Sequence, residues 1–306
     1  MPPAAPLDRR AWVHLLWIGP IGIVFAAAAV LIANAFRHTP AGAAFLESYP
    51  GTVPLPDAAP TGFPAWLSIQ HFLSAFFLLL IIRTGFVLRR KQRPATFWTR
   101  NNTGLIRTKN PPRRLGLTLW FHLALDVLWV LNGAVYYMLL FATGQWMRLV
   151  PLSWDHLPNA LSAALQYVSL DWPYENGWVN YNSLQLLAYF ATVFIAAPLA
   201  IATGIRLSSV WPQGDTRLNR LYPENWARAL HFPVMIYFLL FVAAHVFLVF
   251  TTGALRNLNH MYAGRDDESW IGAIIFAGSV VVMIVGWILA RPAILKRIAS
   301  RTGAIR

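Results

Sequence analysis

Six long apolar stretches constrain the fold of this 306-residue chain more than any other feature. They cover residues 11–36, 64–88, 117–143, 184–205, 226–252 and 270–290. Each is long enough to cross the hydrocarbon core of a bilayer, which takes about 20 helical residues. Because a segment in lipid must satisfy its own backbone hydrogen bonds, each stretch is expected to be an α-helix. The sequence therefore predicts an all-α integral membrane protein, a six-helix bundle that forms a single membrane domain over residues 1–306.

The first stretch also has features of a secretion signal. Arg9 and Arg10 precede it, and Ala33-Asn34-Ala35 resembles a cleavage site. Its apolar run is longer than the usual signal-peptide core of about 7 to 15 residues. A retained membrane anchor is therefore favoured over a cleaved peptide.

The distribution of basic residues predicts the orientation. With six spans, both termini and the loops after the second and fourth spans share one side, which carries 20 Lys+Arg against 4 in the opposite loops. Loops rich in Lys and Arg stay in the cytoplasm. We expect a multi-pass protein of the cell inner or plasma membrane with both termini cytoplasmic. Topology accounts for the net charge of +13, so no nucleic-acid partner is expected.

The chain contains no cysteine. Disulfides, iron–sulfur clusters, thiolate metal sites and thioether-bound haem are therefore excluded. No nucleotide-binding glycine motif or catalytic triad pattern is evident, so no catalytic residues are predicted. Any redox group would be bound through histidine or another non-thiol ligand.

Histidines within the spans are the main candidates for a functional site, because ionisable groups in a membrane are costly. Five of the eight histidines lie there: His14, His71, His122, His231 and His245. The remaining three lie in or beside outer loops and are expected at the surface. His231 and His245 share one span, and their spacing of 14 residues returns to within about 40° of the same helix face. That helix offers one imidazole in each leaflet, about 21 Å apart.

Depth in the bilayer suggests which histidines meet. His71 and His245 each lie about 11 Å from the outer ends of their spans. His231 lies about 8 Å from the inner end, as does His122, whereas His14 lies about 5 Å from it. Haem iron accepts two axial imidazoles, so paired depths favour haem ligation over hydrogen bonding between helices.

The order of the histidines along the chain is distinctive. Over residues 64–252 the four spans carry one, one, none and two of them. Gly85 follows His71 by 14 residues, the third of these spans ends in Ala202-Thr203-Gly204, and the fourth opens with Arg228-x-x-His231. This pattern resembles the di-haem cytochrome b subunits of membrane formate dehydrogenases, nickel–iron hydrogenases and thiosulfate reductases.

The resemblance implies a four-helix haem-binding core over residues 64–252 that holds two haem b groups. Its axial ligand pairs would be His71 with His245 near the outer side and His122 with His231 near the inner side. His14 is then a reserve ligand for the inner haem. The predicted topology turns this core upside down relative to the formate dehydrogenase subunits.

Three charged residues near the predicted inner haem have open roles. Asp126 follows His122 by four residues, so it shares a helix face with that ligand. It is equally compatible with orienting the imidazole through its second nitrogen or relaying protons, and with an ion pair to Arg83. Arg83 and Arg228 are candidate haem-propionate contacts, although snorkelling toward lipid headgroups explains both nearly as well.

The connection at residues 144–183 is a long outer loop rich in tryptophan, with an amphipathic stretch near 159–170. Long ordered loops are usually functional. A helix lying at the membrane interface and a docking platform for a partner are equally compatible with this pattern.

The leading expectation is a di-haem b-type cytochrome that transfers electrons between membrane quinone and an outer-side redox subunit, in the manner of a respiratory chain component. By resemblance, the partner would be a molybdopterin oxidoreductase and would carry out the substrate chemistry. One alternative is a proton or metal transporter lined by the histidines and Asp126. Another is a membrane anchor of an oxidoreductase complex that binds no haem.

Overall fold

The computed structural model of the protein describes residues 9–90, 92–103, 107, 111–173, 176–212, 214 and 216–306. Within these residues, six helices are long and apolar enough to cross a membrane: Leu16–Arg37, Ala65–Arg89, Leu117–Ala142, Ser183–Leu207, Glu224–Thr251 and Ile271–Leu289. Apart from the start of the first, each end lies within two residues of the predicted boundary. The prediction of a multi-pass, all-α membrane protein is confirmed at this level.

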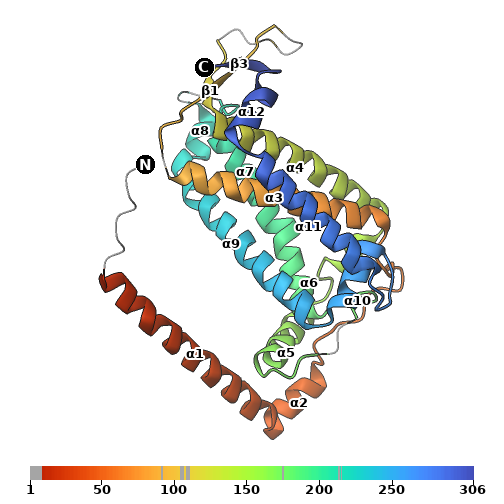
Figure 1. Ribbon diagram of the computed structural model, residues 1–306. Helices are drawn as coiled ribbons and strands as arrows, with labels where there is room; N and C mark the ends of the chain where they lie inside the picture. The colour runs from red at the N-terminus through yellow and green to blue at the C-terminus, as the bar shows by residue number, and fades with distance from the viewer. Residues whose placement is uncertain are drawn as a thin grey trace. The chain divides into compact units, whose positions relative to one another are not determined.

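Figure 1 shows how shorter elements flank the spans. Four helices belong mainly to the first of the two units described below. They are α1 (Arg9–Arg37), α2 (Pro40–Ser48), α5 (His156–Val168) and α6 (Ser183–Phe190). The main helices of the second unit are α3 (Ala65–Arg89), α4 (Leu117–Ala142), α7 (Ala197–Leu207), α9 (Glu224–Thr251) and α11 (Ile271–Leu289). Short helical elements are η1 (Gln145–Arg148), η2 (Ala191–Ala196), α8 (Arg217–Leu221), α10 (Ala254–Leu258), η3 (Asn259–Ala263) and α12 (Pro292–Ala299).

The chain forms two compact units. The first takes in α1, α2, α5 and nearly all of α6. The second takes in α3, α4 and everything from η2 to the carboxyl terminus. His71, His122, His231 and His245 all belong to the second unit, whereas His14 belongs to the first.

A small sheet covers one end of the second unit, here called the sheet end. Its strands β1 (Phe97–Arg100), β2 (Arg114–Gly116) and β3 (Gly303–Ile305) pair antiparallel in the order β2-β1-β3. Trp98 packs with Leu117, Leu295 and Ala299, and its indole nitrogen donates to the carbonyl of Ala299 at 3.1 Å. Strands β1 and β2, which the sequence indicated only as part of a basic loop, therefore lie against α12 and the start of α4.

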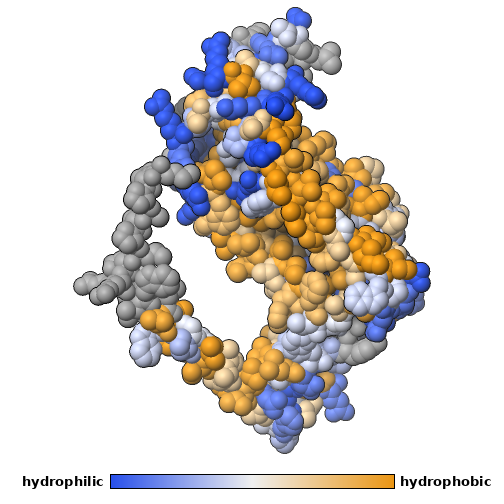
Figure 2. Space-filling view, in the orientation of Figure 1, coloured by the Kyte–Doolittle hydropathy of each residue, from blue (hydrophilic) through white to orange (hydrophobic). Residues whose placement is uncertain are grey.

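Apolar side chains cover the outside of the second unit's long helices. Leu131 on α4, Leu240 on α9 and Ile274 on α11 are all exposed. Figure 2 shows this apolar surface over the helices and hydrophilic residues gathered at the sheet end. Large apolar areas facing outward are unusual in soluble proteins, and they suit helices surrounded by lipid.

The fourth span contains a π-helical segment, η2, between α6 and α7. Pro198 lies in the first turn of α7 and has no backbone N–H. The N–H of Ala197 bonds back to the carbonyl of Thr192, five residues earlier. The next carbonyl, that of Val193, would need the missing N–H of Pro198, and it instead accepts a hydrogen bond from the Tyr137 hydroxyl of α4 at 2.5 Å.

The opposite end of the second unit, here called the α10 end, is organised around Asn259. This side chain is fully buried. Its amide nitrogen donates to the carbonyl and carboxylate of Asp267 and to Ser269, and its oxygen accepts the Gly272 N–H at 2.6 Å. Asn259 therefore fixes the connection between α9 and the start of α11.

Acidification is expected to loosen this connection. Hydrogen bonds from Ser269, followed by one from Arg265, lower the pKa of Asp267 from 3.8 to about 2. Because the folded pKa lies below the unfolded one, the carboxylate stabilises the loop above about pH 4, and this contribution is lost as the pH falls through about 2. Hydrogen-exchange protection of the amides at 259–270 should fall over that range. Asp267→Asn should reduce the pH dependence and leave only the part due to Asp266, whose pKa is lowered by its hydrogen bond from Arg256. An unchanged profile in that variant would contradict the assignment.

Candidate functional site

One histidine pair lies near the α10 end. His71 on α3 and His245 on α9 have ring centroids 6.2 Å apart, with their planes inclined at 59°. His71 is six residues from the first residue of α3, and His245 is six residues from the last residue of α9. Each therefore lies about 9 Å from its helix end. The structure brings together the two histidines that the depth argument paired.

The spacing of these rings fits two ligands on opposite sides of one iron. A metal–imidazole bond is about 2 Å long, and the ring centre lies about 1 Å beyond the nitrogen. Two such ligands in line place their ring centres about 6 Å apart. The observed separation of 6.2 Å between the His71 and His245 ring centres agrees with this distance.

Aromatic neighbours hold both rings of this pair. Tyr262 of η3 meets His71 edge to face, with centroids 6.0 Å apart. Phe241, one turn before His245 on α9, stacks on that imidazole at 5.7 Å and 3°. Such contacts restrict ring rotation, so the two imidazoles are oriented by packing.

Polar atoms without partners mark the same part of α3. Trp66 Nε1, Gln70 Oε1 and His71 Nδ1 are buried and have no hydrogen-bond partner within the described residues. Buried polar atoms are normally paired. Unpaired atoms on one helix are therefore compatible with a bound group that brings its own polar atoms.

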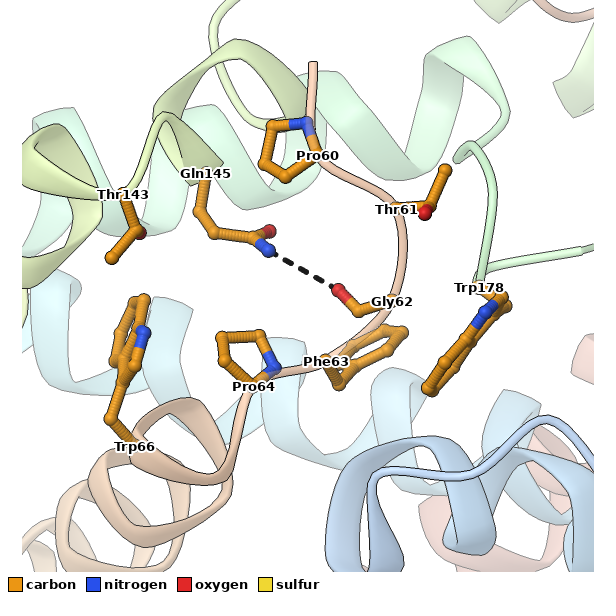
Figure 3. A pocket seen from close by; sticks show the side chains of 9 residues that line it. All are labelled: Pro60, Thr61, Gly62, Phe63, Pro64, Trp66, Thr143, Gln145 and Trp178. Carbon is orange, nitrogen blue, oxygen red and sulfur yellow. Dashed lines mark hydrogen bonds between the residues drawn. The ribbon is translucent and has the colours of Figure 1, made fainter.

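A hollow of about 350 Å³ opens beside Trp66 at the α10 end. Its lining is mostly aromatic and proline side chains: Pro60, Thr61, Gly62, Phe63, Pro64, Trp66, Thr143, Gln145 and Trp178. Figure 3 shows the Gln145 amide reaching across to the Gly62 carbonyl, a bond of 3.3 Å. The hollow is shallow and largely open, and its aromatic lining offers an apolar contact surface.

A second histidine pair lies toward the sheet end. His122 on α4 and His231 on α9 lie on adjoining helices, because a Cβ atom on Gly85 would lie within 4 Å of both the His122 ring and the sulfur of Met235, one turn after His231. The Nδ1 atom of His122 is hydrogen-bonded to the Thr84 hydroxyl at 2.7 Å, and that of His231 to the Thr203 hydroxyl at 2.9 Å. Each imidazole is therefore held through one nitrogen by a threonine on a neighbouring helix.

A glycine follows each of these threonines. A Cβ atom on Gly85 would lie 3.9 Å from the Cε1 atom of His122, and one on Gly204 would lie 3.7 Å from that of His231. Both histidine rings thus border a position where the chain has no side chain. The Gly85 position is the tighter one, since the added Cβ would also lie 3.2 Å from the sulfur of Met235.

Asp126 lies on the other side of the His122 ring from Thr84. Its Oδ2 atom is 3.7 Å from Nε2. The sequence allowed Asp126 to orient the His122 ring by bonding the nitrogen that does not face iron. In the structure that nitrogen, Nδ1, is bonded to Thr84 instead. Arg83, the alternative partner of Asp126, instead donates to the Trp287 carbonyl and lies over the Trp287 ring.

Two more of the predicted site residues lie apart from these contacts. Arg228 is mostly exposed and pairs with Glu224 one turn earlier on α9. His14 lies on α1, in the part of that helix whose side chains are not among those described. The roles expected of Arg83 and Arg228 toward haem propionates, and of His14 as reserve ligand, stay predictions.

The expectation that the remaining histidines lie at the surface is wrong for two of them. His156 is buried and hydrogen-bonded to Ser183 at 3.1 Å. His260 is buried against Phe63 and Trp178, and its Nε2 atom pairs with Asp266 at 2.8 Å. These positions depend on loops folding back onto helices, which no local sequence pattern signals.

The amphipathic stretch of the long loop forms α5, whose orientation is the reverse of that in a soluble protein. Asn159, Ser162 and Ala163 are buried, whereas Leu157 and Leu161 are exposed. An outward apolar face is required by both predicted roles of this loop, the interfacial helix and the docking platform.

Histidine, aspartate and glutamate side chains do not gather in larger groups. No set of three or more that could hold a metal ion occurs within the described residues. A bare metal ion usually takes three or four protein ligands, whereas haem iron needs only two because the porphyrin supplies the rest.

The fold and the site together define a multi-pass all-α membrane protein with two histidine pairs between its helices. Comparison with protein-family models, curated protein sequences and solved structures found no match. The function of this chain is therefore inferred from its own residues and their geometry.

Proposed function

We propose that this protein is a di-haem b-type cytochrome that passes electrons between membrane quinone and a redox partner subunit. His71 with His245 would ligate one haem near the α10 end, and His122 with His231 the other near the sheet end. The observation that carries the proposal is the 6.2 Å separation of the His71 and His245 rings, which suits bis-imidazole ligation of one iron.

The glycines and threonines beside His122 and His231 support the second ligand pair. Gly85 and Gly204 lie at the edge of each imidazole, and the threonine hydroxyls bond the nitrogen that would not bind iron. Haem supplies one-electron transfer, and its potential depends on axial ligands, hydrogen bonding and burial. His231 and His245 are about 21 Å apart along α9. Electron transfer between haems bound at these two positions would span most of the bilayer.

The hollow beside Trp66 supports exchange with quinone. Trp66 and His71 are five residues apart on α3, about 8 Å along the helix axis. Aromatic walls suit a planar ring, and the unpaired Trp66 Nε1 atom is a hydrogen-bond donor near it. The α10 end would face outward, because the basic loops predict a cytoplasmic sheet end. We place the partner, a redox subunit of the molybdopterin oxidoreductase kind, on the outer side.

Optical spectroscopy of the purified protein tests the proposal. A dithionite-reduced minus oxidised spectrum should show b-type bands, and a pyridine haemochrome assay should give two haems per chain. Membranes that contain the whole complex should show haem-dependent oxidation or reduction of quinone. A colourless protein from haem-replete cells would contradict the proposal and favour a transporter, and haem-free copurification with a redox subunit would favour an anchor.

His14→Ala is expected to leave both haems in place, because His122 and His231 form the pair at the sheet end. The haem content per chain should stay at two by pyridine haemochrome. His38→Ala provides a control, since His38 lies outside the spans and bonds the Asn34 carbonyl. Loss of one haem in the His14 variant alone would reassign the ligand pair to His14 and His231.

A further inference from the structure

The geometry around the second histidine pair points to a matched role for Thr84 and Thr203. We infer that they are positioning residues that keep the proton of His122 and of His231 on Nδ1, present each Nε2 to iron, and lower the reduction potential of that haem. The inference rests on the proposed di-haem function and names the residues that would tune one of its two centres.

The direction of the Thr84 hydrogen bond follows from counting protons. The Thr84 hydroxyl lies 3.0 Å from the carbonyl oxygen of Leu80 and 2.9 Å from that of Ile81. Carbonyl oxygens only accept, so the single hydroxyl proton is shared between these two. A hydroxyl that donates to these carbonyls accepts from His122, whose Nδ1 lies 2.7 Å away and would carry the proton. Nε2 is the acceptor nitrogen of that tautomer, and the Oδ2 atom of Asp126 lies 3.7 Å from it, beyond hydrogen-bond distance.

Thr203 repeats this arrangement on a different helix. Its hydroxyl lies 2.7 Å from the Leu199 carbonyl and 3.0 Å from that of Ala200. With its proton on these carbonyls it would also accept, from Nδ1 of His231 at 2.9 Å. Both histidines of this pair are thus set to the same tautomer by a threonine one turn after the carbonyls that bind its hydroxyl.

The residue after each threonine completes the arrangement. Gly85 and Gly204 face the Cε1 atoms of the two rings, and Cε1 is the atom between Nδ1 and Nε2. The Thr-Gly pair thus bonds one nitrogen and places a glycine backbone against the ring edge between the two nitrogens. A short sequence feature, Thr-Gly at 84–85 and again at 203–204, accounts for both halves of the site.

The other histidine pair differs. His71 Nδ1 is buried without a hydrogen-bond partner within the described residues. A hydrogen bond from the second nitrogen raises the basicity of a ligating imidazole, which stabilises the ferric state. The haem at the sheet end, whose two ligands each have a threonine at the second nitrogen, is therefore assigned the lower potential.

Redox titration of the full-length protein tests this assignment. Thr84→Val and Thr203→Val keep the side-chain volume and remove the acceptor. Each should retain two haems and raise one midpoint potential, which lowers the ferric-to-ferrous ratio of that haem at a fixed potential. Thr84→Ser and Thr203→Ser should restore the original value. His71→Ala, which would leave only the sheet-end haem, identifies which midpoint belongs to it.

Thr251→Val is the matched control. Thr251 bonds the carbonyls of Phe247 and Leu248 in the same way but has no histidine partner within the described residues, so both potentials should stay unchanged. Two haems with unaltered potentials in Thr84→Val and Thr203→Val would overturn the inference and leave the proposed function standing. Loss of one haem in the valine and serine variants alike would also overturn it, because that pattern indicates packing. A wild-type protein without haem would refute the proposed function itself.

Discussion

Replacing His71 and His245 together by alanine is expected to leave one haem per chain, whereas replacing His71 and His122 together is expected to leave none. In the first double variant both lost ligands belong to one iron, and the two ligands of the other iron are unchanged. In the second, each iron loses one of its two axial ligands. Because a haem held without thioether bonds depends on those ligands, either single loss should release it. The pairing of the rings, rather than the mere number of histidines, is what the two double variants separate.

Pyridine haemochrome assays on purified variants, normalised to protein, measure the outcome. His122→Ala with His231→Ala should also leave one haem, with spectral bands that differ from those left by the first variant. His38→Ala should retain both haems. Equal haem content in the two kinds of double variant would contradict the pairing. Retention of two haems after any ligand replacement would exclude that histidine as a ligand.

Tyr137→Phe is expected to cause a large loss of stability for the removal of a single oxygen atom. The hydroxyl is the partner of the Val193 carbonyl, which the π-helical segment and Pro198 leave without a backbone donor. An unsatisfied buried polar group costs about 1–3 kcal/mol. In lipid, where no water replaces the lost bond, the cost is several kcal/mol. Unfolding of the protein in mixed micelles measures the change in free energy.

A double-mutant cycle with Pro198→Ala makes this prediction specific. Alanine at 198 restores a backbone N–H close to the Val193 carbonyl, so Tyr137→Phe should cost less in that background. The coupling energy should be at least about 1 kcal/mol. Additive effects of the two substitutions would show that the Tyr137 hydroxyl does not act through this carbonyl.

The six spans were predictable because their signal is local. A run of apolar residues such as 270–290 leaves the backbone in lipid no option but its own hydrogen bonds, so composition alone indicates the helix. The sheet end was not predictable in the same way. Its strands have only three or four residues, and β1 pairs with β3 across some two hundred positions of chain. Neither the periodicity of a short strand nor a basic loop reveals so distant a partner.

The candidate site divides along the same line. The rise per residue of an α-helix converts residue numbers into depth along a span, so the sequence alone predicts that His71 and His245 lie at the same depth. Depth says nothing about which neighbour a ring faces. The Thr84 hydroxyl on His122, the displacement of Asp126 to the other nitrogen, and the burial of His260 depend on how α3, α4 and η3 pack.

The amino-acid sequence by itself indicated a multi-pass membrane protein and, apart from the start of the first span, where its long helices begin and end, because lipid makes backbone structure a property of each segment. Only the tertiary structure decided which imidazoles are neighbours, which hydroxyls hold them, and how the ends of the helices are covered. Those choices depend on rotation and contact between segments far apart in the chain, and side-chain packing selects them where local composition cannot.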